Sequence, residues 1–152
     1  VVKAPSFPMP LPVIASSATE REALHAQQII RRTLDLAEQA EVTFVGIGEF
    51  GDEAPLVVDG FITADELRQM QQAGAVGEIC GWAFDRDGRL IDGLTNARVA
   101  SARIPSRDDT LVIGAAKGPR KRDAIHAALS GRMINGIITD EWTAESIPPP
   151  AG

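Results

Sequence analysis

Cysteine and histidine are scarce in this sequence of 152 residues, which holds one cysteine and two histidines. The single thiol, Cys80, excludes an internal disulfide framework and is typical of a protein of the reducing cytoplasm. Cys80 lies in the apolar run 79–82, so we expect a buried structural thiol. The sequence pairs neither His25 nor His126 with a nucleophile, and it shows no metal-ligand spacing. We therefore predict no catalytic residue, no metal site and no cofactor.

Basic and aromatic residues are also few. The formal net charge is -6, which argues against this chain gripping nucleic acid by itself, since that requires a concentrated basic face. Aromatic residues make up 5% and tyrosine is absent, so aliphatic side chains must fill the core. A hydrophobic content of 44% is enough for one domain of this length.

Long apolar runs are missing too. No stretch approaches the length needed to span a bilayer, and the N-terminus lacks an initiator Met and the apolar centre of a signal peptide. We expect a cytoplasmic protein without a membrane partner. The start at Val1 indicates a fragment, a processed product or a cloning boundary.

Prolines, capping boxes and the spacing of apolar residues predict the secondary structure of the first half of the chain. Four prolines make residues 1–16 an extended arm that lies over something else. A capping box at 17–20 opens a helix that reaches residue 37. The run 42–47 is apolar on both faces, which is typical of a central strand of a parallel sheet. A second capping box, at 63–66, opens a helix that ends near residue 73.

The second half alternates strands and helices around a hairpin. The predicted elements are strands 77–84 and 89–94 about a turn at 85–88, strands 97–104 and 110–115, a helix from 118–119 to 130–131, strand 134–139, a short helix 140–146 and a flexible tail 148–152. This order predicts an α/β fold with an open, mostly parallel sheet and helices on both faces. Ligands of such sheets bind beyond the carboxyl ends of the strands, so the loops after Ile47, Ala115 and Thr139 are the candidates.

The loop after the first strand contains the spacing GxGxxG, beginning at Gly46 and Gly48. A dinucleotide site would need a helix to begin at once, whereas an acidic stretch and Pro55 follow here. Two interpretations remain. The glycines let the backbone pass close to a ligand, or they simply make a tight turn.

Four cations, Lys117, Arg120, Lys121 and Arg122, lie at the start of the helix that follows strand 110–115. Cations oppose the dipole there, each at a cost of about 0.3–1 kcal/mol, unless an anion offsets them. Free amides with Lys or Arg at a helix N-terminus make a phosphate site. A solvated basic turn is an equally good interpretation.

Glu78 is a carboxylate within an apolar, glycine-punctuated run that should be largely buried. A buried carboxylate needs hydrogen-bond donors. Sugar hydroxyls would serve, as would a neighbouring arginine or backbone amides. Asp140 and Glu141 have a simpler role, capping the last helix.

The order of these motifs resembles the sugar-binding domain of the SorC family of bacterial regulators. The similar segments lie between about Ala4 and Ile147, and they are 45–48, 74–78, 84–88, 121–129 and 138–144. The resemblance implies a fold like that of ribose-phosphate isomerase, glucosamine-phosphate deaminase and CoA transferases. It also implies that Glu78 accepts sugar hydroxyls, that Lys121 holds a phosphate, and that Gly46 and Gly48 border the pocket.

The same resemblance implies a phosphorylated sugar as effector and operator DNA as partner, contacted through an N-terminal helix-turn-helix. It further implies a homo-oligomer, either dimer or tetramer. The family's domain begins with a strand and a phosphate loop that we do not find here, so we expect residues 1–152 to be the later part of the domain, with the helix-turn-helix absent. The family's glycine pair before the lysine is replaced by 114–117, Gly-Ala-Ala-Lys, which narrows the approach of a ligand to the backbone.

Three functions compete at this point. The leading hypothesis is an effector-sensing domain that binds and does not catalyse. A sugar-phosphate isomerase or deaminase would need a carboxylate base and a second acid–base group, and only Glu78 is in place. The third is an interaction or oligomerisation fragment without ligand binding.

Overall fold

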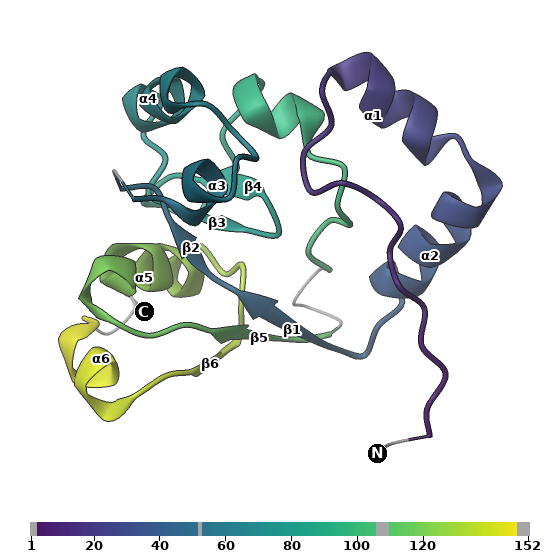
Figure 1. Cartoon of the computed structure of the whole chain (residues 1–152). Coiled ribbons are helices and arrows are strands. Elements are labelled where there is room, and N and C mark those ends of the chain that lie inside the picture. The colour runs from purple at the N-terminus through teal and green to yellow at the C-terminus, as the bar shows by residue number, and fades with distance from the viewer. Residues whose placement is uncertain (1–2, 52, 106–109, 149–152) are drawn as a thin grey trace.

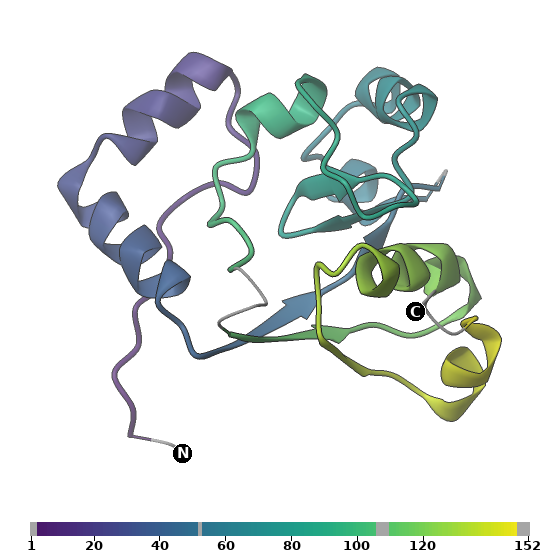
Figure 2. The ribbon, with the colours of Figure 1, turned by 180° about the vertical axis from the view of Figure 1, so that it is seen from behind.

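The computed structural model describes residues 3–51, 53–105 and 110–148. The elements in chain order are α1 (Ala18–His25), α2 (Gln28–Glu38), β1 (Val42–Gly46), β2 (Gly48–Glu49), α3 (Pro55–Val58), α4 (Ala64–Gln72), β3 (Gly77–Ile79), β4 (Trp82–Phe84), the 3-10 helix η1 (Leu94–Arg98), β5 (Leu111–Ala115), the 3-10 helix η2 (Pro119–Lys121), α5 (Arg122–Ser130), β6 (Gly136–Ile138) and α6 (Glu141–Ser146). Figures 1 and 2 show them from opposite sides. No helix in the described part of the chain is long and apolar enough to cross a membrane.

The helix predicted over 17–37 is two helices, separated by Gln27 in an extended conformation. The cap itself is as expected, because the Ser17 side chain accepts a hydrogen bond from Glu20 N. The division follows from a tertiary anchor. His25 Nε2 lies 2.8 Å from Ala100 O, and Arg21 Nε donates to Val99 O at 2.7 Å. These long-range contacts hold α1 against the segment after η1, which local periodicity does not reveal.

A parallel sheet with the strand order β1-β5-β6 forms the lower layer in Figure 1. Val42 to Gly46 pair in register with Leu111 to Ala115, and β5 pairs with β6 from Ile113–Gly136 onward. Helix α5 covers one face, where Val45 and Val112 are buried with its alanines. The predicted strands at 110–115 and 134–139 and the helix before Gly131 are therefore confirmed, with shorter bounds.

A second, antiparallel sheet with the order β2-β3-β4 lies beside the first. The chain passes directly from β1 through Ile47 into β2, so one segment contributes to both sheets (Figure 1). The hairpin of β3 and β4 turns at Cys80 and Gly81, which have φ of 53° and 86°. Positive φ at both central residues is the pattern of a type I′ turn. The expectation of a buried Cys80 is wrong, because this turn lifts it out of the apolar run and exposes it.

The turn predicted at 85–88 is present, with Gly88 N donating to Asp85 O at 2.9 Å. The strand predicted to follow it is only a single bridge between Phe84 and Leu90. The strand predicted over 97–104 is also wrong, since η1 and a bridge between Ile14 and Val99 take its place. The buried Asn96 explains the curled backbone. Its side chain bonds Ala83 N and O and Ile91 O, so it holds η1 across the end of the hairpin.

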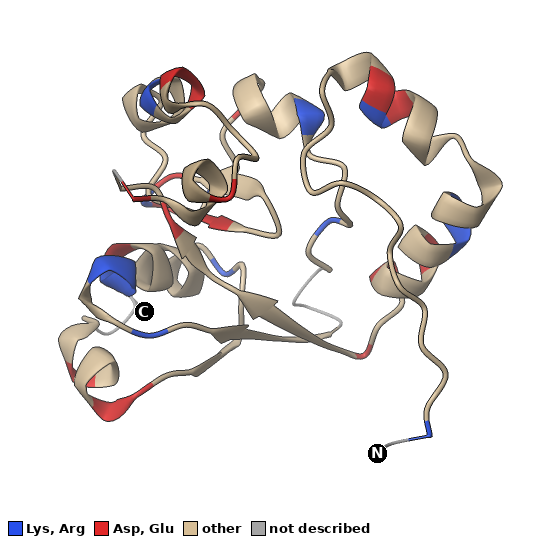
Figure 3. Ribbon diagram, viewed as in Figure 1, with Lys and Arg blue, Asp and Glu red and all other residues tan. Residues whose placement is uncertain are grey.

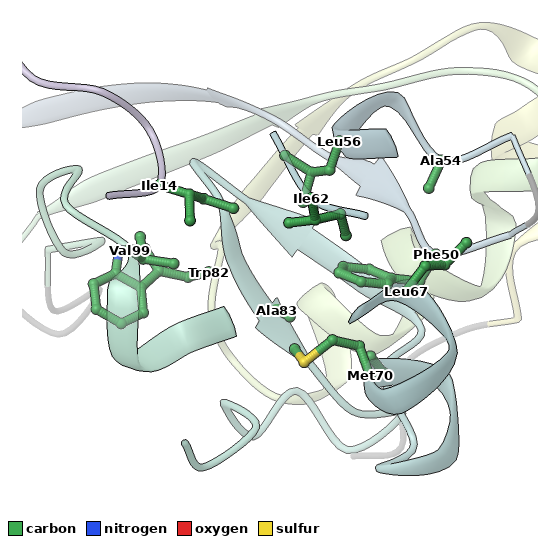
Figure 4. Packing of buried hydrophobic residues seen from close by; sticks show 11 residues of the cluster. Ile14, Phe50, Ala54, Leu56, Ile62, Leu67, Met70, Trp82, Ala83 and Val99 are labelled. Atoms are coloured by element: carbon green, nitrogen blue, oxygen red, sulfur yellow. The ribbon is translucent and has the colours of Figure 1, made fainter. Parts of the chain in front are cut away.

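Two apolar cores follow from the two sheets. One lies beneath α3, α4 and η1 and is built around Phe50, Leu67, Met70 and Trp82 (Figure 4). The other lies between the parallel sheet and α5 and includes Ile47, Phe84 and Ile125. The arm joins the first core only at its end. Ile14 and Ala15 are buried, whereas residues 3–8 are exposed to solvent in this chain.

The predicted α/β class with an open, mainly parallel sheet is confirmed. The expectation of helices on both faces is not met by the described residues. Phe44 and Ile138 point away from α5 and are 66% and 57% exposed. Of the predicted tail 148–152, residues 149–152 lie outside the described part of the chain.

The capping box of α4 offers a direct test of local structure. Thr63 Oγ1 accepts from Glu66 N, and the Glu66 carboxylate accepts from Thr63 N at 2.8 Å. We expect Thr63→Ala to lower the free energy of unfolding by about 1 kcal/mol, the usual value of an N-cap. Urea unfolding followed by circular dichroism measures the change. Thr63→Ser keeps the hydroxyl and should match the parent chain; an equal loss in both variants would contradict the capping role.

Candidate ligand-binding site

All four candidate residues, Gly46, Gly48, Glu78 and Lys121, line one cavity of about 370 Å³. It opens where β1 passes into β2, beside the turn of the β3–β4 hairpin and the end of η2. Glycines 46 and 48 come from the crossing segment, Glu78 from the middle of β3 and Lys121 from the last residue of η2. The structure thus brings together residues that the sequence separates widely.

Glu78 owes its position to the register of the antiparallel sheet, in which it pairs with Gly48. Its side chain lies against the backbone of Gly48, where a Cβ atom would overlap the carboxylate. Glu78 Oε2 accepts a hydrogen bond from Gly81 N at 2.7 Å. Partial burial raises the pKa of Glu78, although the bond from Gly81 and the charge of Lys121 act in the opposite direction. The carboxylate is therefore held by one backbone amide at the edge of the cavity.

Lys121 reaches across to the strand crossing, where its Nζ donates to Ile47 O at 2.7 Å. The side chain is partly buried and ends η2, immediately before α5 begins at Arg122. Ile47 lies between β1 and β2 and belongs to neither strand. Lys121 thus places a positive charge next to Gly46 and Gly48, near enough to Glu78 to influence its ionisation.

A second cavity, of about 520 Å³, adjoins the first at Lys121. It lies at the carboxyl ends of β5 and β6, where the sequence predicted ligand loops. Its lining residues are Ala115, Ala116, Lys117, Lys121, Ile138, Thr139 and Asp140. Lys121 and Lys117 face this cavity together, and Asp140 is occupied as the predicted cap of α6, accepting from Thr143 N at 2.8 Å. That hydrogen bond, more than the nearby Lys117, lowers the pKa of Asp140.

Figure 3 shows blue segments near the start of α5, and the contacts of the four cations of the basic loop divide them into two pairs. Lys117 and Lys121 line the second cavity. Arg120 forms an ion pair with Glu53, and Arg122 pairs with Asp123, and all four of those side chains are exposed. The solvated interpretation therefore applies to the arginines, and the two lysines stay the candidates for binding an anion.

The GxGxxG spacing does not form a nucleotide-binding turn. The chain continues from Gly46 into β2, and the next helix, α3, begins only at Pro55. Gly48 serves the close packing of Glu78, whereas the side of Gly46 is open, with nothing within 4 Å of a Cβ built there. Close packing of the Glu78 side chain accounts for Gly48, whereas no described neighbour requires glycine at position 46.

Several lining residues were not predicted from the sequence. Leu56, Asp59 and Phe61 come from α3 and the turn after it, and Val13 comes from the arm. A helix of four residues with proline at its start has too little periodicity to be recognised. A second buried carboxylate, Glu49, was also missed; it accepts from Gly51 N.

The two cavities combine a hydrogen-bond acceptor, Glu78, with two ammonium groups, those of Lys121 between the cavities and of Lys117 on the second one. This arrangement suits a small ligand that has hydroxyl donors at one end and an anionic group at the other. The described residues contain no group of three His, Cys, Asp or Glu side chains that could hold a metal ion. Fold and cavity together define an α/β domain with a candidate site for a small polar ligand.

Residues 1–147 match the family model Sugar-bind, described as "Putative sugar-binding domain". The chain belongs to this family, the sugar-binding domain of SorC-type transcription regulators. The sequence resemblance to that family is thereby confirmed.

Among curated relatives, the erythritol catabolism regulatory protein EryD of Brucella abortus is 34% identical over 143 residues, which are 94% of this chain and 45% of that protein. The transcriptional regulator LsrR of Klebsiella pneumoniae is 34% identical over 148 residues, covering 91% of this chain and 44% of that protein. The chain therefore spans less than half the length of these relatives.

Solved structures agree with the fold. The sorbitol operon regulator SorC of Klebsiella pneumoniae superposes with a TM-score of 0.77 and 26% identity, covering 88% of this chain and 44% of that one. A sugar-binding domain of a transcriptional repressor from Vibrio fischeri gives a TM-score of 0.80 and 28% identity, covering 91% of this chain and 56% of that one.

Proposed function

We propose that this chain is the effector-sensing domain of a bacterial DNA-binding transcription regulator and that its effector is a phosphorylated sugar. The observation that carries the proposal is the placement of Glu78 and Lys121 on one cavity, with Lys117 on the adjoining one. A carboxylate accepts hydrogen bonds from sugar hydroxyls, and ammonium groups bind a phosphate. The family match and the regulators among its relatives support the same role.

In this proposal each candidate residue has a separate task. The hydroxyls of the sugar donate to Glu78 in the cavity below the hairpin turn. The phosphate lies beyond Lys121, within reach of its Nζ and of Lys117. Lys121 then exchanges its bond to Ile47 O for a charge-assisted bond to the ligand. The Gly46 and Gly48 backbone forms the wall along which the sugar lies.

In this proposal the whole regulator contacts its operator through a helix-turn-helix outside residues 1–152. It acts in the cytoplasm as a dimer or tetramer, and its affinity for DNA changes when the effector binds. The net charge of -6 supports a regulator in which this domain binds the effector and another part contacts DNA. Its named relatives are regulators of catabolism and transcription, which supports a role without catalysis.

The competing enzymatic role would require a second acid–base group facing Glu78. Among the described residues, the other ionisable side chains that line this cavity are Asp59, Cys80 and Lys121, and Lys121 Nζ is engaged with Ile47 O. Isomerisation moves protons between adjacent carbons and needs a base and an acid on the reacting atoms. The preference for binding over turnover therefore rests on the regulators among the relatives.

A thermal-shift measurement against phosphorylated and free sugars tests the proposal on this chain. We expect at least one phosphorylated sugar to raise the melting temperature, and its unphosphorylated form to do so less. Lys121→Ala should weaken the binding of that sugar phosphate on the order of tenfold, the value of one charge-assisted bond. Arg86→Ala, which removes an exposed cation lining another cavity, is the matched control and should bind like the parent.

Two outcomes would contradict the proposal. A folded parent chain that no sugar phosphate stabilises would favour a fragment that serves interaction alone. Conversion of a sugar phosphate into product, detected by nuclear magnetic resonance, would establish the enzymatic role instead.

A further inference from the structure

A further cavity, also of about 370 Å³, shares no lining residue with the cavity that holds Glu78 or with the adjoining one. It lies where α1, β4 and η1 come together. Among its lining residues are Arg21 of α1, Trp82 of β4 and Arg103 from the segment after η1. A space of this size accommodates a small metabolite. The chain therefore carries a second concave surface that the proposed function does not use.

Two guanidinium groups on this cavity lie over the indole ring of Trp82. The Cζ atoms of Arg21 and Arg103 are 5.9 Å and 5.3 Å from the ring centroid, within the range of a cation–π contact. Trp82 itself is 5% exposed, and Figure 4 shows it beside Val99. A guanidinium that contacts a ring through its face keeps its N–H groups in its own plane, where they can meet an oxyanion.

Neighbouring bonds restrict both arginines without using most of their donors. Arg21 Nε donates to Val99 O at 2.7 Å, which leaves the two terminal amino groups of Arg21 without a hydrogen bond to any described residue. Trp82 Nε1 donates to Ala102 O at 3.1 Å and so fixes the backbone directly before Arg103. The guanidinium of Arg103 forms no hydrogen bond within the described part of the chain. Donors that are positioned in advance lower the entropic cost of binding a ligand.

The charge of the cavity lining is positive although the protein is acidic. Acidic residues outnumber lysine and arginine by 21 to 15, yet neither Arg21 nor Arg103 takes part in an ion pair between described residues. Asp92 also lines the cavity, and it forms no such pair either. Two cations that face one cavity repel each other, and a bound anion would offset that repulsion.

We propose that this cavity is a second binding site, which holds the carboxylate or phosphate group of a small organic anion. Arg21 and Arg103 donate charge-assisted hydrogen bonds to the oxygens of that group. Leu90 and Ile91, which line the same cavity, contact the carbon atoms of the ligand. The site shares no residue with the cavity of Glu78 and Lys121, so this proposal does not depend on the function proposed above.

The fluorescence of Trp82 provides the test, because its ring contacts both arginines. Trp142→Phe removes the other tryptophan, which is 59% exposed on α6, and leaves Trp82 as the single emitter. The chain with this substitution is titrated with citrate and, separately, with inorganic phosphate. We expect a saturable change in emission with at least one of them, with a dissociation constant on the order of 1 mM. Sodium chloride at the same ionic strength should give no saturable change, and the better probe identifies the group that binds.

Four further substitutions in the Trp142→Phe chain locate the bound anion. Arg103→Ala should weaken binding on the order of tenfold, the value of one charge-assisted hydrogen bond. Asp92→Asn should strengthen binding about threefold, because a repelling charge leaves the cavity. Lys121→Ala and Arg86→Ala each remove a cation that lines a different cavity, and both should bind like the parent.

A stack that serves stability alone would give different results. A folded chain whose Trp82 emission shows no saturable change with either probe would overturn the proposal. So would equal affinity in the Arg103→Ala variant and the parent. Loss of the signal in Lys121→Ala would also overturn it, because the anion would then occupy the cavity of Glu78. Melting temperatures of the free variants, measured by circular dichroism, show that each is folded; Arg103 is exposed, so its removal should leave the chain folded.

Discussion

Replacing Gly48 by alanine is expected to weaken effector binding strongly while leaving the chain folded. A Cβ at this position would lie 2.8 Å from Glu78 Cδ and would overlap Glu78 Oε1. The flexible Glu78 side chain must therefore swing away, which breaks its bond to Gly81 N and removes the acceptor from the cavity. We expect the affinity for the sugar phosphate to fall on the order of 100-fold and the free energy of unfolding to fall by about 1 kcal/mol.

Gly46→Ala is the matched control for this substitution. Gly46 lies two residues earlier on the same wall, but nothing lies within 4 Å of a Cβ built there. The free variant should be as stable as the parent, and its Glu78 should keep the bond to Gly81. Isothermal titration with the sugar phosphate and urea unfolding supply the two readouts. Equal binding by the Gly48→Ala variant and the parent would show that the effector does not use Glu78.

Glu78→Gln is expected to separate binding from stability. Removing the negative acceptor should lower affinity about 10- to 100-fold, the usual range for hydrogen bonds to a charged group. At pH 7 the free variant should nevertheless be more stable than the parent. The ionised Glu78 is partly desolvated in the folded chain, and the neutral amide avoids that cost while still accepting from Gly81 N.

The pH dependence of the free energy of unfolding follows from the raised pKa of Glu78. Because the pKa of Glu78 is raised above its ordinary 4.5, the folded chain holds this proton more tightly than the unfolded chain. The contribution of Glu78 to stability is therefore complete below pH 4.5 and is lost as the pH rises through the folded pKa. The stability advantage of Glu78→Gln should shrink toward zero in acid, and urea titrations between pH 4 and pH 7 measure it. Glu145→Gln, at an exposed site, should show no such trend.

Local signals predicted the elements whose stabilising contacts are local. The Thr63 cap, the Asp140 cap and the helix before Gly131 all depend on residues within a turn of one another. The break at Gln27 and the curled segment of η1 depend instead on bonds to residues far along the chain, from Arg21 and His25 to 99–100 and from Asn96 to the hairpin. Periodicity carries no information about such partners, so these elements were assigned wrongly.

Strand β1 shows the same division between sequence pattern and tertiary environment. The run 42–47, apolar on both faces, correctly predicted a strand, but the expectation of a central strand is wrong, because β1 lies at an edge of the parallel sheet. The neighbours of a strand, however, are set by pairing across the sheet, and the structure places β1 at an edge with one face uncovered.

The sequence by itself determined that this is an aliphatic α/β domain with an acidic surface, and that Glu78 and Lys121 are its most informative polar residues. These conclusions rest on composition, spacing and the cost of placing charges in apolar runs or at helix starts. Only the tertiary structure decided that both side chains share one cavity, that Lys117 joins Lys121 while the arginines pair with acids, and that Cys80 is exposed. The physical reason is strand register: pairing Gly48 with Glu78, and β1 with β5, brings distant segments together around Ile47.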